Sequence, residues 1–308
     1  MRFSGHFLAS FFAAIVVASG CAPADDELAL AEAIEAPLEP AAGGMFYEPP
    51  SGKNGLRPDE FWSAVAQESM REVQHHPLGG GGSFVNADGT TVHQLPSLPH
   101  TDDLLATYPD VVKYLVQCAL PDTVYVYDHV NDATYQGWWG LAPGWLSANI
   151  STATDAQEWV SGCMIARLNA TGKHVDILLE GAHPAIGVNT VYNLLYPFQE
   201  STVFANMFAS TLPITNNSPA FHAYLCRENN LLNVCLGDGG LGWLDRRVCD
   251  NSPSTCGLVD LGRCAAKSGA CIANGQHWEC RTSVDSPYRV PTVGVQLTNL
   301  LTILDCNN

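Results

Sequence analysis

A group of histidine and carboxylate side chains lies near the middle of the chain, where apolar and polar residues alternate. His174 and Asp176 are two positions apart, so on a strand they share one face, and Glu180 and His183 follow shortly after. An imidazole beside a carboxylate can act as a base with its orienting group, or as a pair of metal ligands. No G-x-S-x-G, S-x-x-K or H-E-x-x-H motif supplies a nucleophile or zinc helix. We therefore favour an ordinary solvent-facing strand and assign no catalytic residue, metal or cofactor.

Indole side chains form the second group that could do chemistry. Trp138, Trp139 and Trp145 are three of the seven tryptophans and are interleaved with glycines. Exposed, flat indoles of this kind can stack on sugar rings, which makes the three residues candidates for ligand binding. The alternative is that they fill the core beneath a loop, because indoles are mostly buried on average.

The N-terminal residues predict export. Arg2 precedes an apolar run over residues 7–18, and small residues lead directly into Cys21. This ending resembles the lipobox of bacterial lipoproteins. The resemblance implies that residues 1–20 are a signal peptide and that fatty acyl chains attach to Cys21 of the mature chain. Two or three such chains would hold the protein firmly at a membrane.

Cysteine content fits an exported protein. The chain has eleven cysteines, and lipidation of Cys21 leaves an even set. Disulfides form in oxidising compartments, so we expect up to five bridges. The favoured single pairing is Cys118 with Cys163, which join the two best predicted helices. No C-x₂-C spacing occurs, and for that reason zinc is not predicted. The candidate disulfide residues are Cys118, Cys163, Cys226, Cys235, Cys249, Cys256, Cys264, Cys271, Cys280 and Cys306.

Charge limits the partners. The chain has 14 Lys and Arg against 31 Asp and Glu, a formal net charge of −17. Such a surface repels phosphate backbones, so we expect no nucleic-acid binding. Residues 21–52 are rich in Ala, Pro and Glu and predict a disordered acidic stalk behind the lipid. Residues 53–308 then form the globular domain, with a possible subdivision near 215–220.

Three helices are predicted from apolar residues at three-to-four spacing. The first begins at Pro58 and ends at Val73. A second runs from an N-cap at Thr101 to Cys118, and Pro109 should kink or divide it. The third is capped by Asp155 and extends to about Asn169.

Strands are predicted in two groups. Two hairpins pair residues 83–85 with 90–93 and 123–127 with 134–139, and a further strand covers 174–179. Residues 203–208 could be helix or strand. The C-terminal candidates are 222–225, 231–236, 290–297 and 300–304. Helices and strands are grouped, not alternating, so we expect an α+β fold: a helical N-terminal half with small antiparallel hairpins and a disulfide-rich β C-terminal part.

The mature chain also resembles cysteine-rich surface lipoproteins of gliding soil bacteria. The resemblance lies in residues 116–121 (VQCALP), 140–145 (GLAPGW), 163–167 (CMIAR) with Asn169, and the cysteine-rich tail. It implies an envelope location and disulfides but no particular activity.

These observations lead to one expectation and one alternative. We expect a lipid-anchored protein of the cell envelope, in the outer membrane and facing either the periplasm or the surface. Its role would be non-catalytic, either structural or in binding a glycan or envelope protein, and the lipid would be its only membrane contact. The alternative is an exported hydrolase that uses His174, Asp176 and His183.

Overall fold

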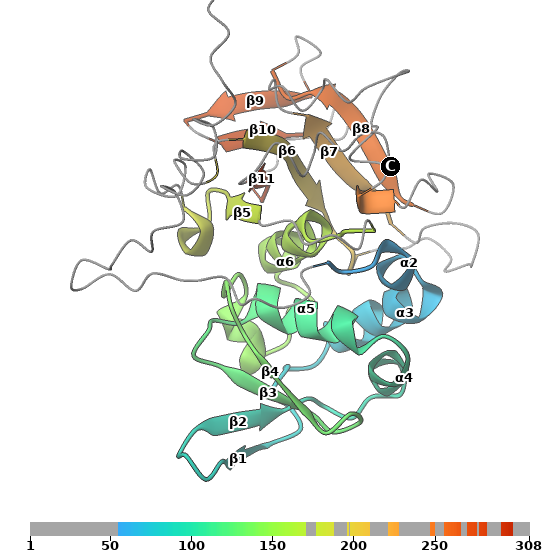
Figure 1. The fold of residues 1–308 in the computed structure, drawn as a ribbon, viewed down its shortest axis with the longest axis vertical. Coiled ribbons are helices and arrows are strands. Elements are labelled where there is room, and N and C mark those ends of the chain that lie inside the picture. The colour runs from blue at the N-terminus through green and yellow to red at the C-terminus, as the bar shows by residue number, and fades with distance from the viewer. Residues whose placement is uncertain are drawn as a thin grey trace, which may run out of the picture. The chain divides into compact units, whose positions relative to one another are not determined.

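The chain divides into two units, Met1–Pro50 and Ser51–Asn308. The computed structural model (Figure 1) describes part of the second unit only. The described residues are 55–170, 177–187, 196, 198–209, 221–227, 247–249, 256–265, 270–275, 277–281 and 291–297. The predicted signal peptide, Cys21 and stalk lie outside them. Within them the fold is α+β, as predicted.

The first predicted helix is two helices, α2 (Pro58–Phe61) and α3 (Ala64–Val73). Ser63 separates them, because its Oγ accepts a hydrogen bond from the Ala66 N–H at 3.2 Å and so caps α3. The same hydroxyl donates to the Glu60 carbonyl at the end of α2.

The second predicted helix is divided at Pro109, as expected, into α4 (Pro99–Thr107) and α5 (Pro109–Ala119). The predicted cap at Thr101 is wrong, since α4 already begins at Pro99. Thr101 is instead buried, and its backbone N–H donates to the carboxylate of Glu72 on α3 at 3.0 Å. This bond helps to hold α4 against α3.

A four-stranded sheet lies beside these helices, in the order β1 (Ser83–Val85), β2 (Thr91–Gln94), β3 (Tyr125–Asp128) and β4 (Ala133–Gln136). Both predicted hairpins are present, because β1 pairs with β2 and β3 with β4 in antiparallel register. Parallel pairing of β2 with β3 joins the two hairpins into one sheet.

A five-stranded sheet is built from the second half of the chain. Its order is β5 (Ile177–Glu180), β11 (Val293–Leu297), β6 (Phe198–Ala205), β7 (Ala223–Arg227) and β8 (Leu258–Arg263). Only the β7 and β8 pair among these is parallel. A separate hairpin is formed by β9 (Cys271–Asn274) and β10 (His277–Cys280). The predicted strands 231–236 and 300–304 lie outside the described residues.

Helix α6 (Thr154–Ala166) is the central element, and every residue from Gln157 to Ala166 is buried. The predicted cap at Asp155 is wrong: the N-cap is Ala153, without a side-chain bond, and Asp155 lies in the first turn. Figure 1 shows α6 between α5 and the five-stranded sheet, where it packs against β6 and β11. A helix covered on two sides is buried all round, which explains its weak amphipathic pattern.

One cluster of buried hydrophobic side chains extends through the domain from Leu56 to Val293. A smaller cluster surrounds Phe204 and four cysteines near the β9–β10 hairpin. Of the helices in the described ranges, none has the length and apolar character needed to span a bilayer.

Candidate functional site

Trp145 lies in the core. It belongs to the short 3₁₀ helix η1 (Pro143–Leu146), and its side chain is completely buried. The indole N–H donates to the His76 carbonyl at 2.9 Å, and the ring meets Phe208 edge to face at 5.4 Å between centroids. Because no face of this indole reaches solvent, we remove Trp145 from the predicted row of sugar-stacking residues.

Trp138 and Trp139 are partly exposed and follow β4 after one residue. Their backbone N–H groups donate to the carbonyls of Leu120 and Gln117, so the pair is anchored at the C-terminal end of α5. The preceding Gly137 is needed for this approach, because a Cβ there would collide with the Pro121 carbonyl. The two rings are tilted by 33° with centroids 5.6 Å apart, and so do not form one flat platform.

Arg167 occupies one side of Trp139, which the sequence did not indicate. Its guanidinium lies 4.0 Å from the Tyr114 ring centroid and 4.8 Å from that of Trp139, and its Nη1 donates to Gln117 at 2.6 Å. Within the described residues no carboxylate forms an ion pair with it. A desolvated cation between aromatic rings can gain about 2 kcal/mol per contact.

Burial decides the electrostatics of this cluster. It lowers the pKa of Arg167 to about 9, although the neighbouring Tyr114 favours the charged form. Burial likewise raises the pKa of Tyr114, whose hydroxyl accepts the Gly55 N–H at 2.5 Å. At neutral pH the guanidinium is charged and the phenol neutral. The cluster therefore fastens the C-terminal end of α6 to α5.

His183 is the one described member of the predicted hydrolase trio, since His174 and Asp176 lie outside the described residues. It precedes the 3₁₀ helix η2 (Pro184–Ile186), where its Nδ1 accepts the Ala185 N–H at 3.2 Å. Its ring meets Trp159 at 5.3 Å, and burial lowers its pKa. In the part of the chain that is described, it has no carboxylate partner. A helix-capping role accounts for these contacts.

Disulfides join all eight of the described cysteines in pairs. The predicted bridge between Cys118 and Cys163 is confirmed and links α5 to α6. Cys235 and Cys306 lie outside the described residues, as does the possible fifth bridge. The other three pairs are Cys226 with Cys264, Cys249 with Cys256 and Cys271 with Cys280.

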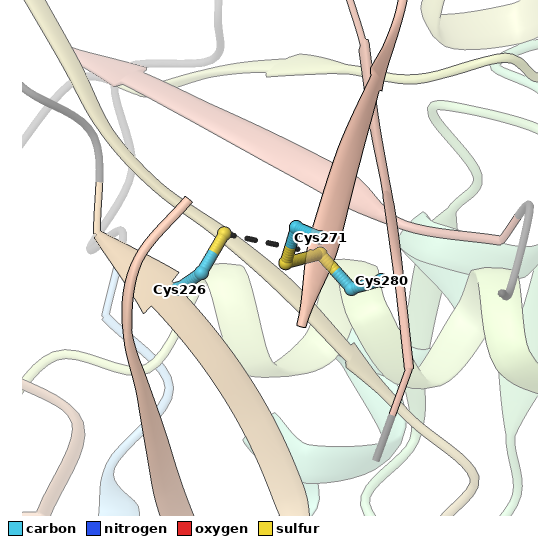
Figure 2. Close-up of side chains that lie close together, drawn as sticks. All are labelled: Cys226, Cys271 and Cys280. Carbon is cyan, nitrogen blue, oxygen red and sulfur yellow. Dashed lines mark hydrogen bonds between the residues drawn. A yellow bond between two sulfur atoms is a disulfide. The ribbon is translucent and has the colours of Figure 1, made fainter. Parts of the chain in front are cut away.

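Two of these bridges touch each other. The Sγ atoms of Cys226 and Cys280 are 3.9 Å apart, and Figure 2 shows Cys226 beside the disulfide of Cys271 and Cys280. The bridge between β7 and the end of β8 therefore packs against the bridge inside the β9–β10 hairpin. The surrounding side chains are apolar, with Phe204 buried and Trp278 partly buried. Spacing along the sequence did not predict this contact, because pairings across distant strands have no local pattern.

Comparison of the chain with known protein families, with curated proteins and with solved structures finds no significant match.

Proposed function

We propose that this chain is an exported, lipid-anchored protein of the cell envelope, with a non-catalytic binding or structural role. The observation that carries the proposal is the pairing of all eight described cysteines into disulfides. Such bridges persist in oxidising compartments and are rare where thiols are kept reduced. They support export independently of the lipobox at Cys21.

In this proposal the parts of the chain have separate tasks. Acyl chains on Cys21 anchor the protein, residues 22–52 space the domain from the membrane, and residues 53–308 form the displayed domain. Its N-terminal part is mainly helical with small hairpins, and its C-terminal part is a disulfide-rich β structure. The outer membrane is the expected location.

Metabolic labelling with a palmitate analogue tests the anchor. The unmodified chain should become labelled in its native host or another lipoprotein-processing bacterium, and Cys21→Ser should abolish the label. The double variant Cys118→Ser/Cys163→Ser is the control, because it removes two cysteines that are buried in the domain. Labelling that persists in Cys21→Ser would refute the lipoprotein assignment.

Counting free thiols tests the oxidised state separately. The mature protein, unfolded in guanidinium without reductant, should react with no thiol reagent. A reactive thiol would contradict the pairing of the ten remaining cysteines into five bridges.

Ligand binding is expected at Trp138, with Trp139 beside it, because both indoles are partly exposed. A glycan array can compare the unmodified domain with Trp138→Ala. The matched control is Phe84→Ala, which removes an aromatic side chain that is 37% exposed on β1. Retention lost in Trp138→Ala but kept in the control would support glycan binding. Equal retention on every glycan would exclude this surface.

A further inference from the structure

Four cysteines that are far apart in the sequence form one buried group, which we call the four-cysteine cluster: Cys226, Cys264, Cys271 and Cys280. Cys226 lies on β7, Cys264 follows β8, and Cys271 and Cys280 face each other across the β9–β10 hairpin. The Sγ atoms of Cys226, Cys271 and Cys280 all lie within 4.8 Å of one another (Figure 2). Cys264 is bonded to Cys226. Three of the four sulfurs therefore lie close together, and the fourth is bonded to one of them.

One spacing among these sulfurs matches that of a metal site. Zinc–sulfur bonds of about 2.3 Å in a tetrahedron place neighbouring sulfurs about 3.8 Å apart. The Sγ atoms of Cys226 and Cys280, which are not bonded, are already 3.9 Å apart. After reduction the two bonded pairs would have to separate, and the sulfur of Cys264 would have to approach the two hairpin cysteines.

The geometry points to a second state of the four-cysteine cluster, in which its reduced form binds one Zn²⁺ through four thiolates. An external dithiol gives two electrons and two protons to each disulfide and becomes a disulfide itself. Zn²⁺ then displaces the protons of the four thiols, which pass to solvent. Thiolate is a preferred zinc ligand, and a set of four is the usual closed, structural type of site.

Charge near the cluster favours thiolates. Arg227, Arg263 and Arg281 are the sequence neighbours of Cys226, Cys264 and Cys280, in a chain with only 14 Lys and Arg against 31 Asp and Glu. Arg227 lies on β7, Arg263 is the last residue of β8, and Arg281 follows β10. Positive charge beside a cysteine stabilises its thiolate form. Arg227 forms an ion pair with Asp260, with 3.1 Å between Nη2 and Oδ2.

Zinc would also change what the sulfurs connect. In the oxidised state one bridge lies within the hairpin and the other joins β7 to the end of β8, so neither links hairpin to sheet. Strands β9 and β10 pair only with each other in the described part of the chain. An isolated hairpin is marginally stable. A metal bound by all four cysteines would cross-link this hairpin to the five-stranded sheet.

Cobalt titration tests the site in the full chain. The protein is reduced with a dithiol without oxygen, freed of reductant and titrated with Co²⁺, which reports tetrahedral thiolate coordination by its visible and charge-transfer absorption. We expect one equivalent to bind, Zn²⁺ to displace it, and the oxidised protein to show no such spectrum. Absence of the spectrum from the reduced protein would overturn the proposal.

Mapping the protected cysteines identifies the ligands without any substitution. In the reduced, zinc-loaded protein, Cys226, Cys264, Cys271 and Cys280 should resist alkylation, whereas Cys249 and Cys256 should react, as mass spectrometry of peptides would show. Protection of a different set, or of none, would overturn the proposal.

Paired variants give a second, independent readout. Cys271→Ser/Cys280→Ser should lose the cobalt spectrum, and Cys249→Ser/Cys256→Ser should keep it, although each removes one bridge from the C-terminal part. A spectrum that survives in the first variant would count against the site. The lipid anchor plays no part in these measurements, so their failure leaves the proposed export of the chain untouched.

Discussion

The guanidinium of Arg247 and the carboxylate of Glu200 form a two-point ion pair inside the domain. Nη2 lies 2.6 Å from Oε2 and Nε lies 2.9 Å from Oε1, and both side chains are almost completely buried. The third guanidinium nitrogen, Nη1, donates to the carbonyls of Ala166 and Leu168 at the end of α6. One side chain thus ties β6, α6 and residues 247–249 together.

Glu200→Gln should destabilise the domain by about 3–5 kcal/mol, because it leaves a buried guanidinium without its compensating charge. Urea unfolding followed by circular dichroism measures the loss. The double variant Glu200→Leu/Arg247→Met removes both charges and should recover much of it. A loss below about 1 kcal/mol for Glu200→Gln would contradict the importance of this pair.

Gly162→Ala should destabilise the domain by about 1–3 kcal/mol, although alanine is the better helix former. A Cβ at Gly162 would lie 2.8 Å from Cγ2 of Val293, so α6 and β11 would be forced apart. Thermal unfolding measures the change, and adding Val293→Ala should restore part of the stability. Gly144→Ala is the control, since a Cβ there meets no atom within 4 Å. Equal effects at both glycines would refute the close packing.

Local patterns predicted the elements that depend on neighbouring residues. Apolar spacing located α5 and α6, Pro109 divided its helix as expected, and turn residues located both hairpins. The bridge between Cys118 and Cys163 followed from placing each on a predicted helix. These inferences worked because hydrogen bonds of helices and hairpins connect residues close in sequence.

Apart from the bridge between Cys118 and Cys163, contacts between distant segments were not predicted. Parallel pairing of β2 with β3, the salt bridge of Arg247 with Glu200 and the four-cysteine cluster each join residues without a shared local pattern. Trp145 shows the same limit, because glycine-flanked indoles have one sequence signature whether they are exposed or buried. The contacts of the Arg167 guanidinium with the Tyr114 and Trp139 rings likewise depend on how α6 packs on α5, which the sequence does not indicate.

Asp128 should make the stability of the domain depend on acid pH. Burial alone would raise the pKa of this completely buried carboxyl, but hydrogen bonds from Asn131, Tyr135 and the Val130 N–H outweigh it and hold the pKa below its ordinary value. A lowered pKa in the folded state stabilises the protein above the unfolded pKa of about 3.9, and this contribution disappears as pH falls through the folded value.

Asp128→Asn should therefore lower the melting temperature near neutral pH. The further decrease in melting temperature as pH falls below about 4 should be smaller in this variant than in the unmodified protein. Melting temperatures measured from about pH 7 to about pH 2 test this. Asp88→Asn is the matched control, because Asp88 also accepts a turn N–H, from Thr90, but is exposed. If Asp128→Asn matches the unmodified protein at every pH, the bonds to this carboxylate do not contribute to stability.

Removing disulfides one at a time should lower the free energy of unfolding by amounts that increase with the length of the loop each bridge closes. The bridge from Cys118 to Cys163 has a sequence separation of 45, and that from Cys249 to Cys256 a separation of 7. The chain-entropy relation then gives about 4 kcal/mol for the first and about 2.5 kcal/mol for the second. Urea unfolding of Cys118→Ala/Cys163→Ala and Cys249→Ala/Cys256→Ala compares them under identical conditions. An equal or larger loss for the second pair would show that local packing around Val248, and not restriction of the unfolded chain, dominates there.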